Sequence, residues 1–335
     1  MLCPAMTASA APILASWRAA ADARAQSAAP AGSTSVIDEV GRRVEIPAKV
    51  NRIVSLSPDL TETIYALGLD GKLVGDTNFC DTPPAAKLKA HVGSPKTPSL
   101  EAIAALRPDV VLASTSINRV ETADALARLG IAVYTTNPQT VRGVLKSIGD
   151  VADVLQASAQ GQELVGRLQA RLDVLGMKLA DLPLAHVFFV VWENPLTTIG
   201  QNTFIADALR FAGAESVILS DQNWPEISFE EVVRLQPDYV VYTSRHSGDS
   251  GELLARLRKQ EAWRGLHAVE MGHVVNISDE IARPSVGLVD AIEELARDVH
   301  PEAFSTGEEF APGKWNRRRV AEAQNCREEL AACAR

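Results

Sequence analysis

The sequence predicts an α/β protein in which two doubly wound α/β lobes are joined by one long helix. Its 335 residues exceed the roughly 250–300 at which a single hydrophobic core stops growing. In two regions, short apolar segments typical of buried strands alternate with segments of helical periodicity, which indicates parallel sheets with helices on both faces. Between these regions, residues 141–182 are almost continuously helical in pattern, so we expect this segment to connect the lobes.

The expected organisation is a signal-like leader at 1–33, an N-terminal lobe at 34–140, a linking helical segment at 141–182, a C-terminal lobe at 183–304 and a charged tail at 305–335. The leader is rich in alanine and has Ala-Arg-Ala before Gln26, which suits cleavage after export. No positive charge precedes its apolar part, so the alternative is a disordered leader. Because no run of about 20 apolar residues is present, no transmembrane helix is expected.

The first lobe begins with a predicted β-hairpin at 36–50, where apolar and polar residues alternate around a glycine. RIVSL (52–56) predicts a short buried strand. The helix after it has Ser57 or Asp59 as its cap and Glu62 in its first turn. Further elements are expected, in order, at 72–77 (strand), 78–87 (loop), 121–130 (helix), 131–136 (strand), 186–192 (strand), 202–213 (helix), 252–263 (helix), 272–278 (strand) and 286–299 (helix).

Two stretches of the chain are near-copies of each other. SLEAIAALRPDVVLAS (99–114) recurs as SFEEVVRLQPDYVVYTS (228–244). In each copy the serine predicts a helix N-cap, Pro-Asp ends the helix, and the apolar run predicts a buried strand. One copy per lobe indicates that the two lobes share this helix and strand unit.

Charge and cysteine usage narrow the classes of function. The net charge is −9, and the only basic run is NRRR at 316–319, whereas nucleic-acid binding needs clustered basic residues. We expect small molecules or a basic protein face as partners. None of the four cysteines pairs with another at metal-ligand spacing, which disfavours zinc and iron–sulfur sites. No cofactor is expected.

Six segments, taken in order, resemble the periplasmic substrate-binding proteins of ABC importers for cobalamin, ferric siderophores and haem. They are RIVSLSPDLTETIYALGL (52–69), NFCDTPP (78–84), SLEAIAALRPDVVLAS (99–114), ENPLTTIGQNTFIADAL (193–209), NWPEISFEEVVRLQPDYVV (223–241) and RPSVGLVDAIEELARDVHPE (283–302). SLSPDLTE and FCDTPP look most like the cobalamin-binding branch, although Pro95 stands where those binders carry an aromatic residue. The resemblance implies a monomeric, exported binding protein of the periplasm, without enzymatic activity, that delivers a corrinoid to a permease and ATPase complex.

Ligands of doubly wound lobes bind at the carboxyl ends of the strands, and Phe79, Trp192 and Trp224 fall in loops expected there. Aromatic residues make up only 5% of the chain, so this placement indicates a flat, apolar ligand. The alternative is that each ring packs inside its own loop. The full set of candidate ligand-binding residues is Phe79, Cys80, Asp81, Trp192, Trp224, Arg245, Asp279 and Arg283.

Three polar candidates keep alternative interpretations. Arg283 is either an ordinary loop residue or a donor to the ligand. Asp279 matches an acid that contacts ligand in cobalamin binders, or else it caps a turn. His246 would suit a metal in the open face of a ligand, but no second ligand is evident in the sequence, which favours a solvated loop histidine.

Glu101 and Glu230 each stand two residues after the serine of a repeated stretch. The third position, which closes a capping box, is Ala102 in one copy and Glu231 in the other. The resemblance implies that one acid on each lobe docks into arginine pockets of the permease. The alternative is that each acid only complements the partial positive charge of its helix N-terminus.

Other functions stay open on the sequence alone. A ferric siderophore would require more basic groups at the site, and haem would require a tyrosine or histidine ligand. A chelatase-like enzyme would require converging metal ligands and a proton acceptor, which the scattered histidines do not indicate. Because a helix ties the lobes, we expect small closure motions.

Overall fold

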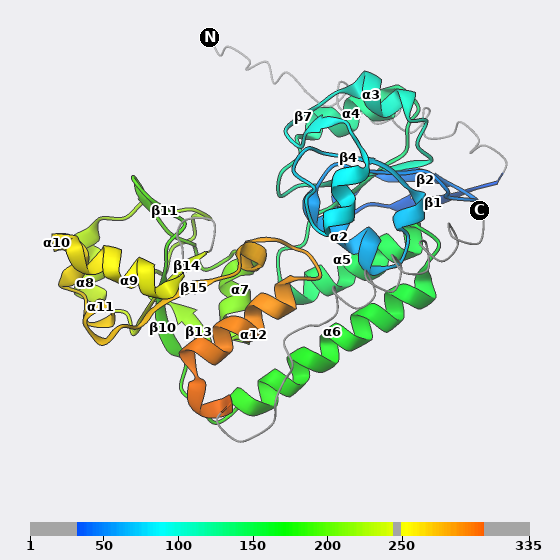
Figure 1. The fold of residues 1–335 in the computed structure, drawn as a ribbon. Coiled ribbons are helices and arrows are strands. Elements are labelled where there is room, and N and C mark those ends of the chain that lie inside the picture. Colours follow the sequence, from blue (N-terminus) through cyan, green and yellow to red (C-terminus); the bar gives the residue numbers. More distant parts are fainter. Residues whose placement is uncertain (1–31, 244–248, 305–335) are drawn as a thin grey trace, which may run out of the picture.

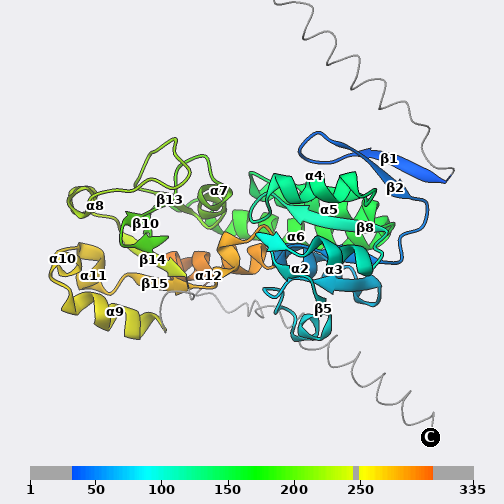
Figure 2. The same ribbon diagram turned by 90° about the horizontal axis from the view of Figure 1, so that it is seen from above.

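A computed structural model describes residues 32–243 and 249–304 and shows two α/β lobes joined by the long helix α6 (Ser158–Leu179) (Figures 1 and 2). Residues 1–31 of the predicted leader, the predicted tail, and the candidates Arg245 and His246 lie outside the described residues. Ser33, which the sequence places in the leader, instead begins the strand β1 (Ser33–Ile37). Within the described part, no helix combines the length and apolar character needed to cross a bilayer. The predicted fold class is confirmed.

The N-terminal lobe contains a parallel sheet with strand order β5-β4-β3-β8-β9. Its strands are β3 (Ile53–Ser55), β4 (Leu73–Asp76), β5 (Ala90–His91), β8 (Val110–Ser114) and β9 (Val133–Thr136). Successive side chains of a strand point to opposite faces. Leu112 therefore packs toward α2 (Pro58–Ala66) and α5 (Val141–Val154), and Val111 toward α3 (Leu100–Ala105) and α4 (Val120–Arg128).

The C-terminal lobe repeats this plan with strand order β13-β10-β14-β15, again all parallel. Its strands are β10 (Ala185–Phe189), β13 (Ala214–Ser216), β14 (Tyr239–Thr243) and β15 (Val274–Ile277). Val187 packs with α7 (Phe204–Phe211) and α12 (Leu288–Val299) on one face. Phe188 packs on the other face, which is covered by α8 (Phe229–Leu235), α9 (Ser250–Lys259), α10 (Glu261–Arg264) and α11 (His267–Met271).

A hairpin precedes the first sheet, as residues 36–50 predict. Strands β1 (Ser33–Ile37) and β2 (Arg43–Pro47) pair antiparallel. The turn between them contains Gly41 at φ +84°, a conformation that glycine adopts without steric cost.

The repeated stretches fold alike, and the structure gives a reason for the repeated serine and the repeated aspartate. The hydroxyls of Ser99 and Ser228 accept hydrogen bonds from the backbone N–H groups of Ala102 (3.1 Å) and Glu231 (3.3 Å), so both predicted caps are confirmed. The Asp109 carboxylate accepts from the backbone N–H of Arg52 at 2.9 Å. In the same way, the Asp238 carboxylate accepts from the backbone N–H of His186, in β10, at 2.9 Å. Each repeated aspartate thus ties its strand to the neighbouring central strand.

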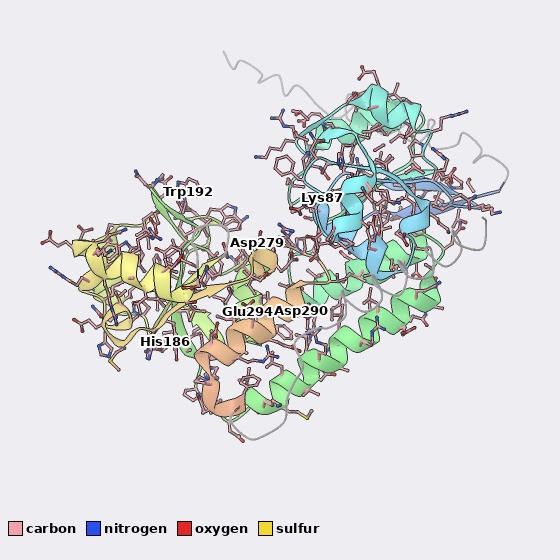
Figure 3. All side chains as sticks on the ribbon, viewed as in Figure 1. Lys87, His186, Trp192, Asp279, Asp290 and Glu294 are labelled. Atoms are coloured by element: carbon pink, nitrogen blue, oxygen red, sulfur yellow. The ribbon has the colours of Figure 1, made fainter. Side chains whose placement is uncertain are left out.

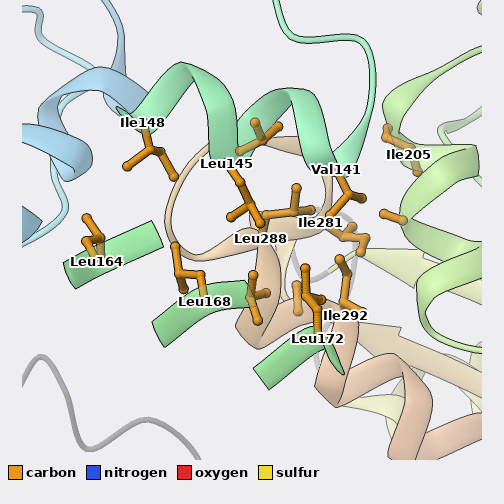
Figure 4. Close-up of a cluster of buried hydrophobic side chains, with 14 of the residues drawn as sticks. Val141, Leu145, Ile148, Leu164, Leu168, Leu172, Ile205, Ile281, Leu288 and Ile292 are labelled. Atoms are coloured by element: carbon orange, nitrogen blue, oxygen red, sulfur yellow. The ribbon is translucent and has the colours of Figure 1, made fainter. Parts of the chain in front are cut away.

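The linking segment is two packed helices, α5 and α6, separated by a turn in which Gln156 has φ +61°. Apolar side chains of both helices join those of α7 and α12 in one cluster that runs from the first sheet to the second (Figure 4). The backbone N–H of Val141 also donates to Asp207 of α7 at 2.8 Å. The connection between the lobes is therefore a continuous packed core and not a lone strut.

Close packing of α5 on α6 depends on Gly161, because a Cβ there would lie 2.4 Å from the Cβ of Ala152. We expect Gly161→Ala to lower the free energy of unfolding, measured with urea, by about 1–3 kcal/mol, as overpacking does. The control is Gly166→Ala on the same helix, where the added methyl group meets open space. There the better helix propensity of alanine should stabilise the fold by up to about 1 kcal/mol. Equal effects at both positions would contradict the close contact.

Candidate functional site

A cluster of charged side chains lies where the two lobes meet. It consists of Asp59, Glu62, Asp279, Glu280 and Arg283, and we call it the interlobe cluster. Asp279 begins the short helix η3 (Asp279–Ala282), which lies between the lobes above α12 (Figure 3). Glu62 belongs to α2 of the other lobe, so the cluster joins residues from both halves of the chain.

Arg283 is the centre of this cluster. Its guanidinium lies 3.2 Å from the Glu62 carboxylate, 3.0 Å from Asp279 and 3.3 Å from Glu280. The Glu280 carboxylate also accepts a hydrogen bond from the Ser285 hydroxyl at 2.9 Å. The arginine is thus already bound by three carboxyl groups, one of which comes from the opposite lobe.

The local sequence explains why two acids enter this region from α2. The helix begins at Pro58, directly after the carboxyl end of β3, and Asp59 and Glu62 are three residues apart on one face. Both side chains are about 5% exposed. Ser57 is at the N-cap position, but its hydroxyl donates to Asp59 and does not cap a backbone N–H.

Burial and an excess of negative charge shift the protonation of these acids. Burial, followed by the repulsion of the Glu280 carboxylate, raises the pKa of Glu62 to about 8, although Arg283 acts in the opposite direction. Burial also raises the pKa of Asp59. Near neutral pH, Glu62 therefore holds a proton in the folded protein.

The expectation that Glu62 stands in the first turn of its helix is wrong, because the helix begins at Pro58 and Glu62 is its fifth residue, with its side chain buried in the interlobe cluster. It is a candidate site residue that the sequence reasoning missed. Its partner Arg283 is 221 positions away, and no local pattern predicts such a contact. The only sequence signal for a role of Glu62 in the site is its spacing of three residues from Asp59, which places both acids on one face of the helix.

The three aromatic candidates are on the surface. Phe79 is 58% exposed, Trp192 54% and Trp224 51%. The interpretation that each ring is packed inside its own loop is therefore wrong. In Figure 3, Trp192 and Asp279 lie on the side of the molecule away from α6. These rings offer apolar surface that a ligand would cover.

The Cys80 side chain is buried and stabilises its loop through hydrogen bonds. The thiol is 1% exposed and is hydrogen bonded to the hydroxyls of Thr61 (3.1 Å) and Thr77 (3.2 Å). A side chain with so little free surface offers no contact to a ligand, so we reassign Cys80 from ligand contact to loop support. The neighbouring Asp81 is exposed and keeps its place among the candidates.

Glu101 and Glu230 are both exposed, one in the first turn of α3 and one in the first turn of α8, on different lobes. The Ser99 hydroxyl donates to the Glu101 carboxylate at 3.1 Å. Hydrogen bonding by the backbone and by Ser99 lowers the pKa of Glu101. On the second lobe, the residue next to Glu230, Glu231, pairs with Arg234 at 2.6 Å. Both predicted docking acids are thus solvent-accessible and available to a partner.

A pocket of about 220 Å³ lies beside the interlobe cluster. This space includes open solvent, so the pocket does not enclose a large ligand. Its lining residues are Leu60, Thr63, Thr136, Pro138, Ser147, Ile148, Val151 and Pro284. Across residues 32–243 and 249–304, no group of three or more His, Cys, Asp or Glu side chains is arranged to hold a metal ion.

Comparison with known proteins adds three findings. A family profile described as periplasmic binding protein matches residues 53–281. The uncharacterized ABC transporter substrate-binding lipoprotein YvrC of Bacillus subtilis is 29% identical over 84% of this chain and 90% of its own. The crystal structure of the periplasmic vitamin B12 binding protein BtuF of Vibrio cholerae matches with a TM-score of 0.67 at 25% identity, covering 76% of this chain and 98% of that one.

A periplasmic heme binding protein from Pseudomonas aeruginosa has the same fold, with a TM-score of 0.67 at 23% identity over 75% of this chain and 93% of that one. Its fold is as similar to this chain as that of the vitamin B12 binder. The overall fold therefore does not distinguish between these ligands. The ligand has to be inferred from the residues of the site.

Proposed function

Since the chain belongs to the periplasmic binding protein family and is a substrate-binding protein of an ABC importer, we propose that its substrate is a corrinoid, cobalamin. It would hold the ligand between the two lobes, at the carboxyl ends of the strands, and deliver it to the permease and ATPase of the importer. We propose that it acts in the periplasm as a monomer, without catalysing a reaction and without binding nucleic acid.

The observation that carries this proposal is that the Arg283 guanidinium already has carboxyl partners within the protein. An anionic ligand requires a free cationic group, yet this guanidinium is bound by Glu62, Asp279 and Glu280. A surplus of carboxyl groups disfavours the propionates of haem and the anionic groups of ferric siderophores. The amide side chains of a corrin ring are neutral and donate hydrogen bonds, so an acidic surface suits them.

The exposed aromatic rings support the same ligand class. Phe79 of one lobe and Trp192 and Trp224 of the other present more than half of their surface to solvent. Covering apolar area contributes about 25 cal/mol per Å², and large rings give much area with few rotatable bonds. A wide, partly apolar macrocycle makes better use of these surfaces than a small ion.

A ferric siderophore or haem is the second candidate, favoured by the shared fold of the Pseudomonas aeruginosa heme binder. Haem would require a protein ligand for its iron. His246, the candidate for that role, lies outside the described residues. The charge of the interlobe cluster favours the corrinoid over both anionic ligands.

A fluorescence titration separates these ligands. Cyanocobalamin, cobinamide, haemin and several ferric siderophores are added to the purified protein while tryptophan emission is followed. We expect cyanocobalamin to quench the emission with a sub-micromolar dissociation constant at one ligand per protein. Tight binding of a siderophore or of haemin, with no response to either corrinoid, would overturn the proposal.

Ligand binding should change the shape of the protein only slightly. Because one apolar cluster spans α5, α6, α7 and α12 (Figure 4), a wide hinge motion would have to break a packed core. We expect the radius of gyration from solution scattering to be the same, within error, with and without saturating cyanocobalamin. A large compaction would contradict the continuous core as the element that restrains the lobes.

A further inference from the structure

Trp192 and Trp224 belong to one hydrogen-bonded unit, which we call the aromatic platform. It consists of β11 (Trp192–Glu193), β12 (Leu196–Thr197) and the segment 223–227. β11 and β12 pair antiparallel. On its other side, the chain from β12 to Gly200 exchanges backbone hydrogen bonds with 223–227, at 3.0–3.1 Å. The two tryptophans are thus carried by the outer segments of one unit.

The platform is closely packed where it joins the lobe. A Cβ on Gly200 would lie 1.8 Å from the backbone oxygen of Gln222, so only glycine allows this approach. The Trp192 indole N–H also donates to the backbone oxygen of Asn194 at 2.8 Å. The backbone of the platform is therefore well defined, and its orientation depends on what anchors it.

Glu193 supplies that anchor. One carboxylate oxygen accepts from the Tyr242 hydroxyl at 2.8 Å and from Arg256 at 2.7 Å, and the other accepts from Arg256 at 2.9 Å. A bidentate pair between a guanidinium and a carboxylate fixes the relative orientation of the two groups as well as their distance. Tyr242 is fully buried on β14, and the guanidinium lies 5.8 Å from the centre of its ring. The platform is thereby attached to the core of the C-terminal lobe.

The anchor also sets the direction of Trp192. Neighbouring side chains of a strand point to opposite faces. With Glu193 directed toward Tyr242 and α9, Trp192 points away from the lobe, and its ring is 54% exposed. In Figure 1, the β11 hairpin stands at the end of the C-terminal lobe, above α9.

We propose that Glu193 and Arg256 are positioning residues, which hold Trp192 and Trp224 as one preformed surface for stacking on a flat macrocyclic ligand. The ligand part of this proposal rests on the proposed function. Neither residue touches the ligand. By holding the platform in one orientation before the ligand arrives, they reduce the conformational entropy that binding would otherwise cost. Preorganisation of this kind raises affinity.

The test uses the full-length protein and the substitutions Arg256→Met and Glu193→Gln. Arg256→Met keeps the aliphatic stem and removes the guanidinium, whereas Glu193→Gln keeps the shape and still accepts from Tyr242. The matched control is Lys259→Met, which removes one positive charge from an exposed position on the same helix. Urea unfolding and far-ultraviolet circular dichroism verify that each variant folds.

The first readout needs no ligand. We expect Arg256→Met and Glu193→Gln to change acrylamide quenching of the tryptophan emission, while Lys259→Met leaves it at the wild-type value. In a Trp192→Phe background, the change caused by Arg256→Met should be largely lost, since Trp192 reports it. Quenching that is the same in Arg256→Met and wild type would overturn the positioning role, whatever the ligand is.

The second readout is the affinity for cyanocobalamin. We expect Arg256→Met to weaken it about tenfold, in the range of one lost stacking contact. Arg256→Met combined with Trp192→Phe should weaken it no more than Trp192→Phe alone, because the two act through the same contact. Additive losses would overturn the proposal. If wild-type protein binds no corrinoid, the proposed function fails, and the quenching experiment still decides the positioning role.

Discussion

We expect the double substitution Glu101→Ala with Glu230→Ala to abolish uptake while ligand affinity stays at the wild-type value. The two acids lie on different lobes, in the first turns of α3 and α8, and both are exposed. Neither closes a capping box, so the helices do not need them for folding beyond about 0.3–1 kcal/mol each. We propose that both acids contact arginine pockets of the permease.

Uptake is measured with labelled cobalamin in vesicles that contain the cognate permease and ATPase. The matched control is Glu121→Ala with Glu252→Ala, which removes exposed first-turn acids from α4 and α9, again one on each lobe. The control should transport at the wild-type rate. If both double variants transport equally well, Glu101 and Glu230 only complement their helix N-termini and take no part in docking.

The second large effect is expected from Arg283→Met. Removal of the guanidinium leaves Glu62, Asp279 and Glu280 close together without a counter-charge. Removing one partner of a fully buried ion pair costs about 3–5 kcal/mol, and the 21% exposure of the Arg283 side chain lowers this, so we expect about 2 kcal/mol near neutral pH. Adding Glu62→Gln should recover little of this loss near neutral pH, where Glu62 is already protonated, and should recover part of it only above about pH 8, where Glu62 would otherwise ionise.

The contribution of Glu62 to the stability of the fold changes with pH in one direction. Folding raises the pKa of Glu62 from about 4.5 to about 8. Below about 4.5 the residue is protonated in both states, and between the two values only the folded state keeps the proton. The contribution of Glu62 to stability is therefore complete below about 4.5 and is lost as pH rises through about 8.

Thermal or urea unfolding from pH 4 to pH 9, in steps of about one unit, measures this dependence. We expect the stability of wild type to fall with rising pH more steeply than that of Glu62→Gln. The loss caused by Arg283→Met should also grow with pH, as Glu62 ionises without its partner. A wild type and a Glu62→Gln variant with parallel profiles would show that Glu62 does not hold the proton.

Local signals in the sequence predict the fold well. The serine caps, the Pro-Asp breaks and the strand and helix periods depend on neighbouring residues, and Ser99 and Ser228 adopt the predicted cap geometry. The long helical segment is predicted as a connection, but its division into α5 and α6 is not. The helices are divided at the turn where Gln156 has φ +61°, a conformation for which glutamine gives no local signal. The close approach of the two helices at Gly161 likewise depends on the packed partner.

The site is harder to predict because its contacts are distant in sequence. Glu62 meets Arg283 across 221 positions, and Glu193 meets Arg256 across 63. Burial is equally non-local: the loop that exposes Phe79 buries the adjacent Cys80. The sequence identifies the aromatic loops, whereas only the folded chain shows which side chain of each loop faces outward.

Competitive equilibrium dialysis shows directly which ligand the protein selects. The full-length protein is dialysed against an equimolar mixture of cyanocobalamin, haemin and a ferric siderophore, and its cobalt and iron contents are then measured by mass spectrometry. We expect one cobalt per protein and iron at the level of a protein-free control. Iron retained at one atom per protein, with no cobalt, would contradict this expectation.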